Sequence, residues 1–168
     1  MSKLKALLLT QGMHGMVSQV EGLAKALNLN YKHQEIKLKK FWNFIPPLLT
    51  PISMSVLESQ FIFDSKVVIS CGRKSVIPSL ALKKKYKEKI FTIHIQNPNI
   101  ASTYFDLLVV PEHDKLTGKN IIVSEGSLHL VDKKNIKIAF NKLRIKHLKG
   151  LKEHIVVLIG GDTRAQKI

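Results

Sequence analysis

Short, uninterrupted apolar runs recur along the chain, and each one stops at a glycine-bearing or polar stretch. The β-branched run ending in Ser70 is the clearest, because it stops abruptly at Cys71 and Gly72 and is followed by helically spaced residues. Such runs are typical of strands covered on both faces, whereas a strand with one wet face alternates apolar and polar residues. The pattern predicts a mostly parallel sheet between helices, a Rossmann-like three-layer α/β domain.

Apolar runs and helical segments alternate before the lysine-rich C-terminal part. The helical segments follow the first and third runs, and their apolar residues recur every three or four positions. In the second helical segment Pro78 is acceptable only within the first turn, where no intrahelical bond is lost. Strands are predicted at 4–9, 31–38 and 67–70 and within KIFTIHIQNP, FDLLVVPEHD and NIIVSEGSLH, and helices from Val17 to Leu27 and from Val76 onward.

The length and cysteine content restrict the class of protein. A chain of 168 residues can bury a sufficient core without disulfides, and its single cysteine, Cys71, cannot form an internal one. The N-terminus has no cleavable signal pattern, and prolines interrupt the apolar stretch from Phe44 to Leu57. We therefore expect a cytoplasmic protein without a membrane-spanning helix.

The strong positive charge would ordinarily suggest a nucleic-acid partner. The formal net charge is +15, but only three of the 27 basic residues are Arg: Arg73, Arg144 and Arg164. Sequence-reading proteins rely on the bidentate fork of Arg, and a lysine-rich surface is often simply solvated. Nucleic-acid binding is therefore not expected.

The C-terminal part changes in character. Residues 131–151 are lysine-rich with apolar residues at helical spacing, and HIVVLIGGDT then predicts a new buried strand with a Gly-Gly exit. One interpretation divides the chain into a Rossmann-like domain (1–131), a linking amphipathic helix (132–152) and the first strand of a truncated second domain (153–168). The other adds this last strand to the first sheet.

The loops that follow the strands should meet at one edge of the sheet. In open parallel sheets, ligands bind at the carboxyl ends of the strands. The loop SCGRKS leads from a strand into a helix, where backbone N–H groups and the helix dipole favour an anion, although a tight turn with a solvated Arg explains it equally simply. The loops expected at this edge are 10–16, 71–74, 96–99, 111–114 and 125–129.

Several of these blocks resemble a known family. TQGMHGMVSQVEGLAKAL, ISCGRKSVIPSLALKKK, HIQNPN, FDLLVVPEHD, SEGSLH and VVLIGGDT occur in the order found in the ELM family of mitochondrial-fission and glycosyltransferase-like proteins. The resemblance implies a GT-B architecture, in which two Rossmann-like domains face each other and the C-terminal one holds the nucleotide-sugar donor.

By this resemblance the chain is the acceptor-side N-terminal half of such an enzyme. It implies that the chain is inactive alone, needs no metal or other cofactor, and meets a nucleotide-sugar donor only when a C-terminal half, separately encoded, is supplied. Nothing in the sequence identifies the donor, the acceptor or the linkage.

The first loop supplies four candidate residues. Gly12 and Gly15 would let the backbone approach an acceptor or phosphate, although two glycines fall short of a dinucleotide-binding fingerprint. By the resemblance, Gln19 is retained from the family pattern, whereas Met16 stands where many bacterial relatives have a His. The neighbouring His14 is a weak candidate for a general base and is otherwise a solvated loop residue.

The second and third candidate loops carry polar groups suited to a substrate. Gly72 and Arg73 can hold a phosphate or carboxylate, since a guanidinium grips both bidentately. Gln96 and Asn97 either hydrogen-bond a substrate hydroxyl or cap the turn before Pro98.

The later loops are less specific. His113 is a possible substrate contact, and Asp114 is a weak candidate base that is equally suited to capping a local turn. Ser127 lies close to His129, but this spacing says nothing about the geometry that a hydrolase pair requires. Cys71 is most simply a small buried apolar residue.

The segment Lys39–Leu49 mixes lysines, aromatic residues and prolines. It is either an interfacial patch for an anionic membrane surface or a loop covering the core. The first interpretation would place the protein on the inner face of the membrane. It also supports the alternative function, a non-catalytic adaptor that binds a protein partner or a membrane.

Overall fold

The structure is a computed structural model, and it describes residues 3–147 and Val157. The chain forms two compact units that divide between Leu130 and Val131. The predicted C-terminal strand in HIVVLIGGDT falls largely on 148–156 and 158–168, outside the described residues.

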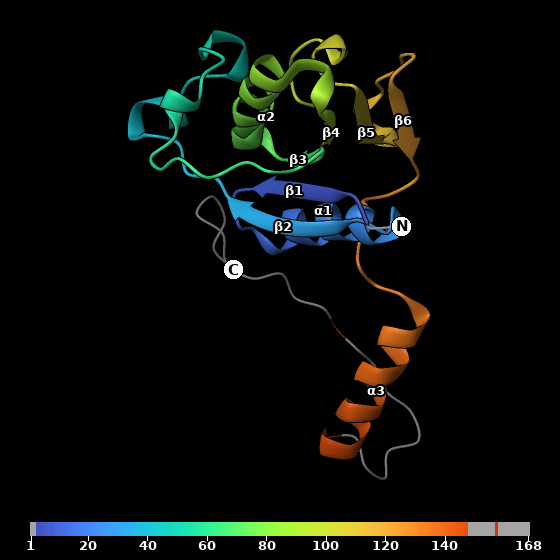
Figure 1. Ribbon diagram of the computed structural model, residues 1–168. Helices are drawn as coiled ribbons and strands as arrows, with labels where there is room; N and C mark the ends of the chain where they lie inside the picture. Colours follow the sequence, from blue (N-terminus) through green and yellow to red (C-terminus); the bar gives the residue numbers. More distant parts are fainter. Residues whose placement is uncertain (1–2, 148–156, 158–168) are drawn as a thin grey trace. The chain divides into compact units, whose positions relative to one another are not determined.

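The first unit is built on a six-stranded sheet in which every pair of neighbours is parallel (Figure 1). The strand order is β2-β1-β3-β4-β5-β6. This confirms the prediction of a Rossmann-like α/β domain. The strands are β1 (Lys5–Thr10), β2 (Asn30–Glu35), β3 (Val67–Cys71), β4 (Phe91–Ile95), β5 (Leu107–Pro111) and β6 (Ile121–Ser124), and the helices of this unit are α1 (His14–Ala26) and α2 (Arg73–Tyr86).

The strand order reverses between β1 and β3. The chain leaves β1 through α1 to reach β2 on one side, then crosses back to place β3 on the other side of β1. In doubly wound sheets a ligand crevice forms at such a switch point, outside the carboxyl ends of the strands. The fold therefore places the loops after β1 and β3 at the position where binding is expected.

Helices α1 and α2 cover opposite faces of the sheet, as Figure 1 shows. Val20 and Ala24 of α1 pack on one face, whereas Ile77 and Leu82 of α2 pack on the other. A further cluster joins α2 to β5, with Val76, Leu80, Phe105, Leu108 and Val110 at its centre. Nearly every residue of β1 and β3 is buried, because both faces of these strands are covered. This explains why their sequences are near-continuous apolar runs.

Pro78 corrects one expectation. It lies in the body of α2, five residues after Arg73, and not in the first turn. An interior proline removes one intrahelical hydrogen bond and ordinarily destabilises a helix by about 3 kcal/mol. Here every residue from Ser75 to Leu82 is buried, so packing against the sheet offsets that loss.

The crossover from β2 to β3 contains no α-helix. It has three short 3₁₀ turns, η1 (Lys40–Asn43), η2 (Pro47–Leu49) and η3 (Met54–Val56). An isolated antiparallel bridge between Leu38 and Leu57 closes this segment into a loop. Trp42, Ile52 and Met54 pack on the core beside α2. Part of this segment therefore covers the face of the sheet where a crossover helix would ordinarily lie.

The second unit contains α3 (Lys133–His147), within the range where an amphipathic helix was predicted. Asp132 precedes this helix and accepts hydrogen bonds from the backbone N–H of Asn135 (2.7 Å) and from its side-chain amide (2.9 Å). An aspartate at this position satisfies an otherwise unpaired N–H of the first turn, which fixes the start of the helix.

Candidate functional site

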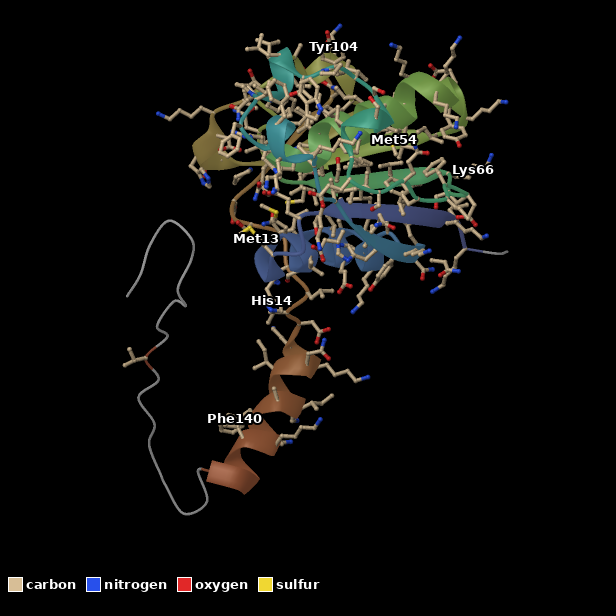
Figure 2. All side chains as sticks on the ribbon, turned by 90° about the vertical axis from the view of Figure 1, so that its left-hand side faces the viewer. Met13, His14, Met54, Lys66, Tyr104 and Phe140 are labelled. Carbon is tan, nitrogen blue, oxygen red and sulfur yellow. The ribbon has the colours of Figure 1, made fainter. Side chains whose placement is uncertain are left out.

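Both sheet-covering helices begin at the carboxyl edge of the sheet. The residues that precede α1 and α2 are Met13 and Gly72, and neither makes a side-chain capping hydrogen bond. Figure 2 shows Met13 and His14 at the start of α1. Uncapped N–H groups at a helix start, together with the positive end of the helix dipole, attract anions and hydroxyl oxygens. The edge thus has two such starts, after β1 and after β3.

Gly72 brings these two loops into contact. Its φ of +86° is a left-handed conformation that favours glycine. A Cβ at this position would lie 2.7 Å from the Sδ and Cε atoms of Met16 and 2.9 Å from Nε2 of Gln11. The lack of a side chain at Gly72 is therefore what allows the first loop to pack against the start of α2.

Two successive hydrogen bonds fix the position of Gly12. Its backbone N–H donates to the Thr10 hydroxyl (3.0 Å), which is 2.8 Å from Nε2 of His33 on β2. Gly12 has a φ of +80°, and a Cβ there would lie 2.9 Å from the carboxyl carbon of Glu35. A carboxylate beside this loop disfavours an anion, so the geometry favours a hydroxyl or cationic group at Gly12 and an anion nearer Gly72.

Arg73 is the cation at the start of α2, and it already has one partner; Lys37, on the other side of the site, pairs with Glu35 at 3.6 Å. The Arg73 Nη2 donates to the backbone carbonyl of Asn43 at 2.7 Å, and the Asn43 side chain in turn donates to the carbonyl of Leu38 at 3.2 Å. The guanidinium therefore ties the β2–β3 crossover to the start of α2. It remains exposed and has further N–H donors that a phosphate or carboxylate can accept from.

The loop after β4 is strained. Gln96 has a φ of +81° although it is not glycine, and its backbone N–H donates to the carbonyl of Val109 (2.9 Å). The next residue, Asn97, donates its N–H to Oδ2 of Asp114 (3.1 Å) and accepts the N–H of Asn99 on its side chain (2.8 Å). Asn97 and Asp114 thus act as turn-forming residues. The Gln96 side chain takes part in neither of these turn-forming hydrogen bonds.

The remaining predicted residues are dispersed. His14 is an exposed residue in the first turn of α1, Gly15 follows it with open space where a Cβ would lie, and Gln19 is buried in the next turn. His113 is exposed, with Nε2 3.7 Å from Asp114. Ser127 is exposed in the segment after β6, which continues to Leu130, whose backbone N–H donates to the Ser18 hydroxyl of α1 (3.3 Å). The structure therefore brings together Gly12 and Gly72 through the first loop, with Arg73 directly after Gly72.

Sequence reasoning missed a polar pair beneath α2. Ser70 and His94 are register partners on β3 and β4, and the Ser70 hydroxyl lies 2.8 Å from Nδ1 of His94. The imidazole stacks on Phe105 at 5.1 Å between ring centroids, and its Nε2 is buried without a hydrogen-bond partner. Burial lowers the pKa of His94 to about 3, so the ring is neutral and belongs to the core.

His33 and Glu35 were also missed, and Thr10 was included only as the first residue of loop 10–16. His33 and Glu35 lie in the largely polar run NYKHQE, which carries no motif of its own. The signal that groups them is the register, in which Thr10 of β1 pairs with Glu35 of β2 and Leu8 with His33. A correct pairing of β1 with β2 would have placed the Glu35 carboxylate beside the first loop.

Other groups have a structural explanation. Burial raises the pKa of the Cys71 thiol to about 12, which keeps it protonated and unreactive. Within the described residues, no cluster of three or more His, Cys, Asp or Glu side chains is arranged to hold a metal ion. A pocket of about 380 Å³ lies between residues 53–63 and the last turn of α2, at the opposite end of that helix from Arg73. No helix in the part of the chain that the structure describes is long and apolar enough to span a bilayer.

Comparisons with known proteins place these observations in a family. The family model described as Mitochondrial fission ELM1 matches residues 14–168. An uncharacterized protein of Rickettsia prowazekii is 27% identical over 86% of this chain and 51% of its own length. The Mitochondrial fission protein ELM1 of Arabidopsis thaliana is 31% identical over 29% of this chain and 11% of its own length.

The chain spans about half the length of the Rickettsia relative, and no solved structure matches it. The family match covers the first loop from His14 onward, both sheet-covering helices and all strands after β1. The chain belongs to the Mitochondrial fission ELM1 family.

Proposed function

We propose that this chain is the acceptor-binding half of a glycosyltransferase of GT-B type. The observation that carries the proposal is the β1–β3 switch point, where two uncapped helix starts, two left-handed glycines and Arg73 meet at the carboxyl edge of a parallel sheet. This arrangement suits a hydroxyl-bearing acceptor with an anionic group. The resemblance of the ordered loop motifs to the family supports the same reaction class.

The charges of the site assign a role to each part. Arg73 and the start of α2 would hold the anionic group of the acceptor, because the positive charge and free N–H donors coincide there. Glu35, which lies beside Gly12, is half exposed and pairs with the Lys37 ammonium (3.6 Å), would accept the proton of the attacking hydroxyl through its other carboxylate oxygen. Asp114 is less suited to that role because it already accepts the Asn97 N–H, and His14 is placed on the exposed start of α1.

The donor would bind a second Rossmann-like half. In the proposed reaction the acceptor oxygen attacks the anomeric carbon, its proton passes to Glu35, and the nucleoside diphosphate leaves with the electrons of the broken bond. This chain would supply acceptor positioning and the base, while the partner half would hold the donor. We therefore propose that the chain is catalytically inactive alone and acts as a cytoplasmic protein with that half.

A joined protein tests the proposal. The chain would be fused to the part of the Rickettsia relative that it does not match, and release of nucleoside diphosphate from a panel of nucleotide sugars would be measured. We expect release from the fusion, none from the chain alone, and a loss of at least tenfold in Glu35→Gln and Arg73→Gln. The matched control is Glu58→Gln, an exposed carboxylate in the β2–β3 crossover.

Two outcomes would count against the proposal. Binding of nucleotide sugars by the chain alone would make it a donor-side domain. Full activity of the Glu35→Gln and Arg73→Gln fusions would remove the switch-point site from the reaction.

A non-catalytic adaptor is the second candidate function. It is favoured by the exposed apolar side chains of the β2–β3 crossover, which a catalytic cleft does not need. An adaptor would bind its partner equally well with Glu35→Gln, so the fusion assay and a binding assay separate the two functions.

A further inference from the structure

A group of large apolar side chains projects into solvent from the β2–β3 crossover. We call Phe41, Phe44, Leu48 and Leu49 the apolar platform. Their exposed fractions are 66%, 84%, 74% and 71%, respectively. Single exposed apolar residues are ordinary, but four of them within nine positions of one crossover are an unusual concentration, and concentrated apolar exposure is typical of a binding surface.

The platform is held in place by contacts on its inner side. Trp42 packs on the core, and its ring meets Phe41 edge-on at 4.8 Å between centroids. Thr50 is buried and its hydroxyl donates to the carbonyl of Pro46 at 2.9 Å. The hydrogen bond from Arg73 of α2 to the carbonyl of Asn43 anchors η1, which carries Phe41. The fold thus fixes the backbone and still leaves the apolar side chains outside.

The charged residues of the segment that carries the platform are all positive. Residues 36–57 contain Lys37, Lys39 and Lys40 but no Asp or Glu, and the whole chain carries a net charge of +15. A second copy of this chain would meet the platform with like charge. An anionic lipid surface complements both properties, because it attracts the lysines and accepts the apolar side chains below its headgroups.

We propose that the apolar platform binds the surface of an anionic membrane. Phe41, Phe44, Leu48 and Leu49 enter the headgroup boundary while Lys39 and Lys40 contact lipid phosphates. This inference stands whether or not the switch-point site transfers a sugar. Arg73 bonds to the platform segment, so membrane binding also brings the switch-point site near lipid headgroups. An acceptor held there would then be anchored to a lipid.

Vesicle sedimentation tests this surface with the full chain. The probes are vesicles of phosphatidylcholine alone and vesicles in which part of the lipid is phosphatidylglycerol. We expect the parent to sediment with the anionic vesicles and to leave them as salt is raised. Phe44→Ser combined with Leu48→Ser should weaken binding by about tenfold or more, since two apolar side chains no longer enter the lipid.

The matched control is Ile62→Ser, because Ile62 is 90% exposed but lies outside the platform. A second pair compares Lys39→Gln and Lys40→Gln with Lys119→Gln, an exposed lysine after β5. All of these side chains are exposed, and an unchanged circular dichroism spectrum would show that each variant folds.

Three results would overturn the proposal. The parent fails to bind anionic vesicles, the Phe44→Ser and Leu48→Ser double variant binds like the parent, or Ile62→Ser loses as much binding as the double variant. A platform that instead docks a protein would give the first of these results.

Discussion

His94 should make the protein sensitive to mild acid. The pKa of its imidazole falls from 6.5 to about 3 because the ring is fully buried. The unfolded chain therefore binds a proton at a pH where the folded chain does not. Stability from this residue is fully present above about pH 6.5 and is lost as the pH falls from there toward 3.

The size of the effect follows from the shift. Each pH unit within the window changes the free energy of unfolding by about 1.4 kcal/mol for one proton. Between pH 6.5 and pH 5 the expected loss from His94 is about 2 kcal/mol, a large share of the roughly 5–15 kcal/mol that stabilises a typical domain. Carboxylates remain mostly ionised over this range, so they contribute little.

Urea unfolding at pH 7 and pH 5, followed by circular dichroism, measures this loss. The variant His94→Asn retains a polar partner for Ser70 but has no proton to gain. We expect it to be less stable than the parent at pH 7 and to lose about 2 kcal/mol less than the parent between the two pH values. His113→Asn, at an exposed ring, is the matched control. An equal loss in His94→Asn and the parent would refute the reasoning.

Three further predictions concern contacts of the first unit. Gly22→Ala should destabilise the protein by about 1–3 kcal/mol in thermal unfolding, because the new Cβ would lie 2.6 Å from the carbonyl oxygen of His129. This loss should outweigh the higher helix propensity of Ala, and a gain in stability would show that the contact can relax. Burial alone raises the pKa of Asp106, but hydrogen bonds from Lys83 (2.8 Å) and Thr92 lower it overall. Asp106→Asn should therefore lower the free energy of unfolding in urea at pH 7 by about 1–2 kcal/mol. An unchanged unfolding midpoint would contradict the pairing. Cys71 should resist a thiol reagent such as dithionitrobenzoate at pH 8 until the chain is unfolded, so rapid labelling of the native protein would contradict its burial.

The strands and helices were predictable because their apolar periodicity is strong. The strand predicted at 67–70 is found as β3 (Val67–Cys71), and the helix predicted from Val76 onward is found as α2, which begins three residues earlier, at Arg73. The edge that carries the loops followed from the parallel order. Boundaries were less certain: the second strand was expected at 31–38 but ends at Glu35, where the chain turns into the crossover.

Other features depended on information that is not local. The β2–β3 crossover has no periodicity, because its aromatic residues divide between the core and solvent: Trp42 packs inward while Phe44 is exposed. The Ser70–His94 pair depends on register, which a single sequence does not reveal. Pro78 was judged by helix propensity alone, and the sheet beneath α2 overrides that propensity.

The reversed strand order has a consequence for how the chain folds. β1 pairs with β2 through a nearby crossover, but its other neighbour is β3, and the paired residues Leu8 and Ile69 are about 60 residues apart along the chain. The pairing of β1 with β3 at the centre of the sheet therefore requires closure of the whole β2–β3 crossover, and loop closure of this length slows folding. Trp42 packs on the core within that crossover, so its fluorescence should report the late step rather than the early pairing of β1 with β2.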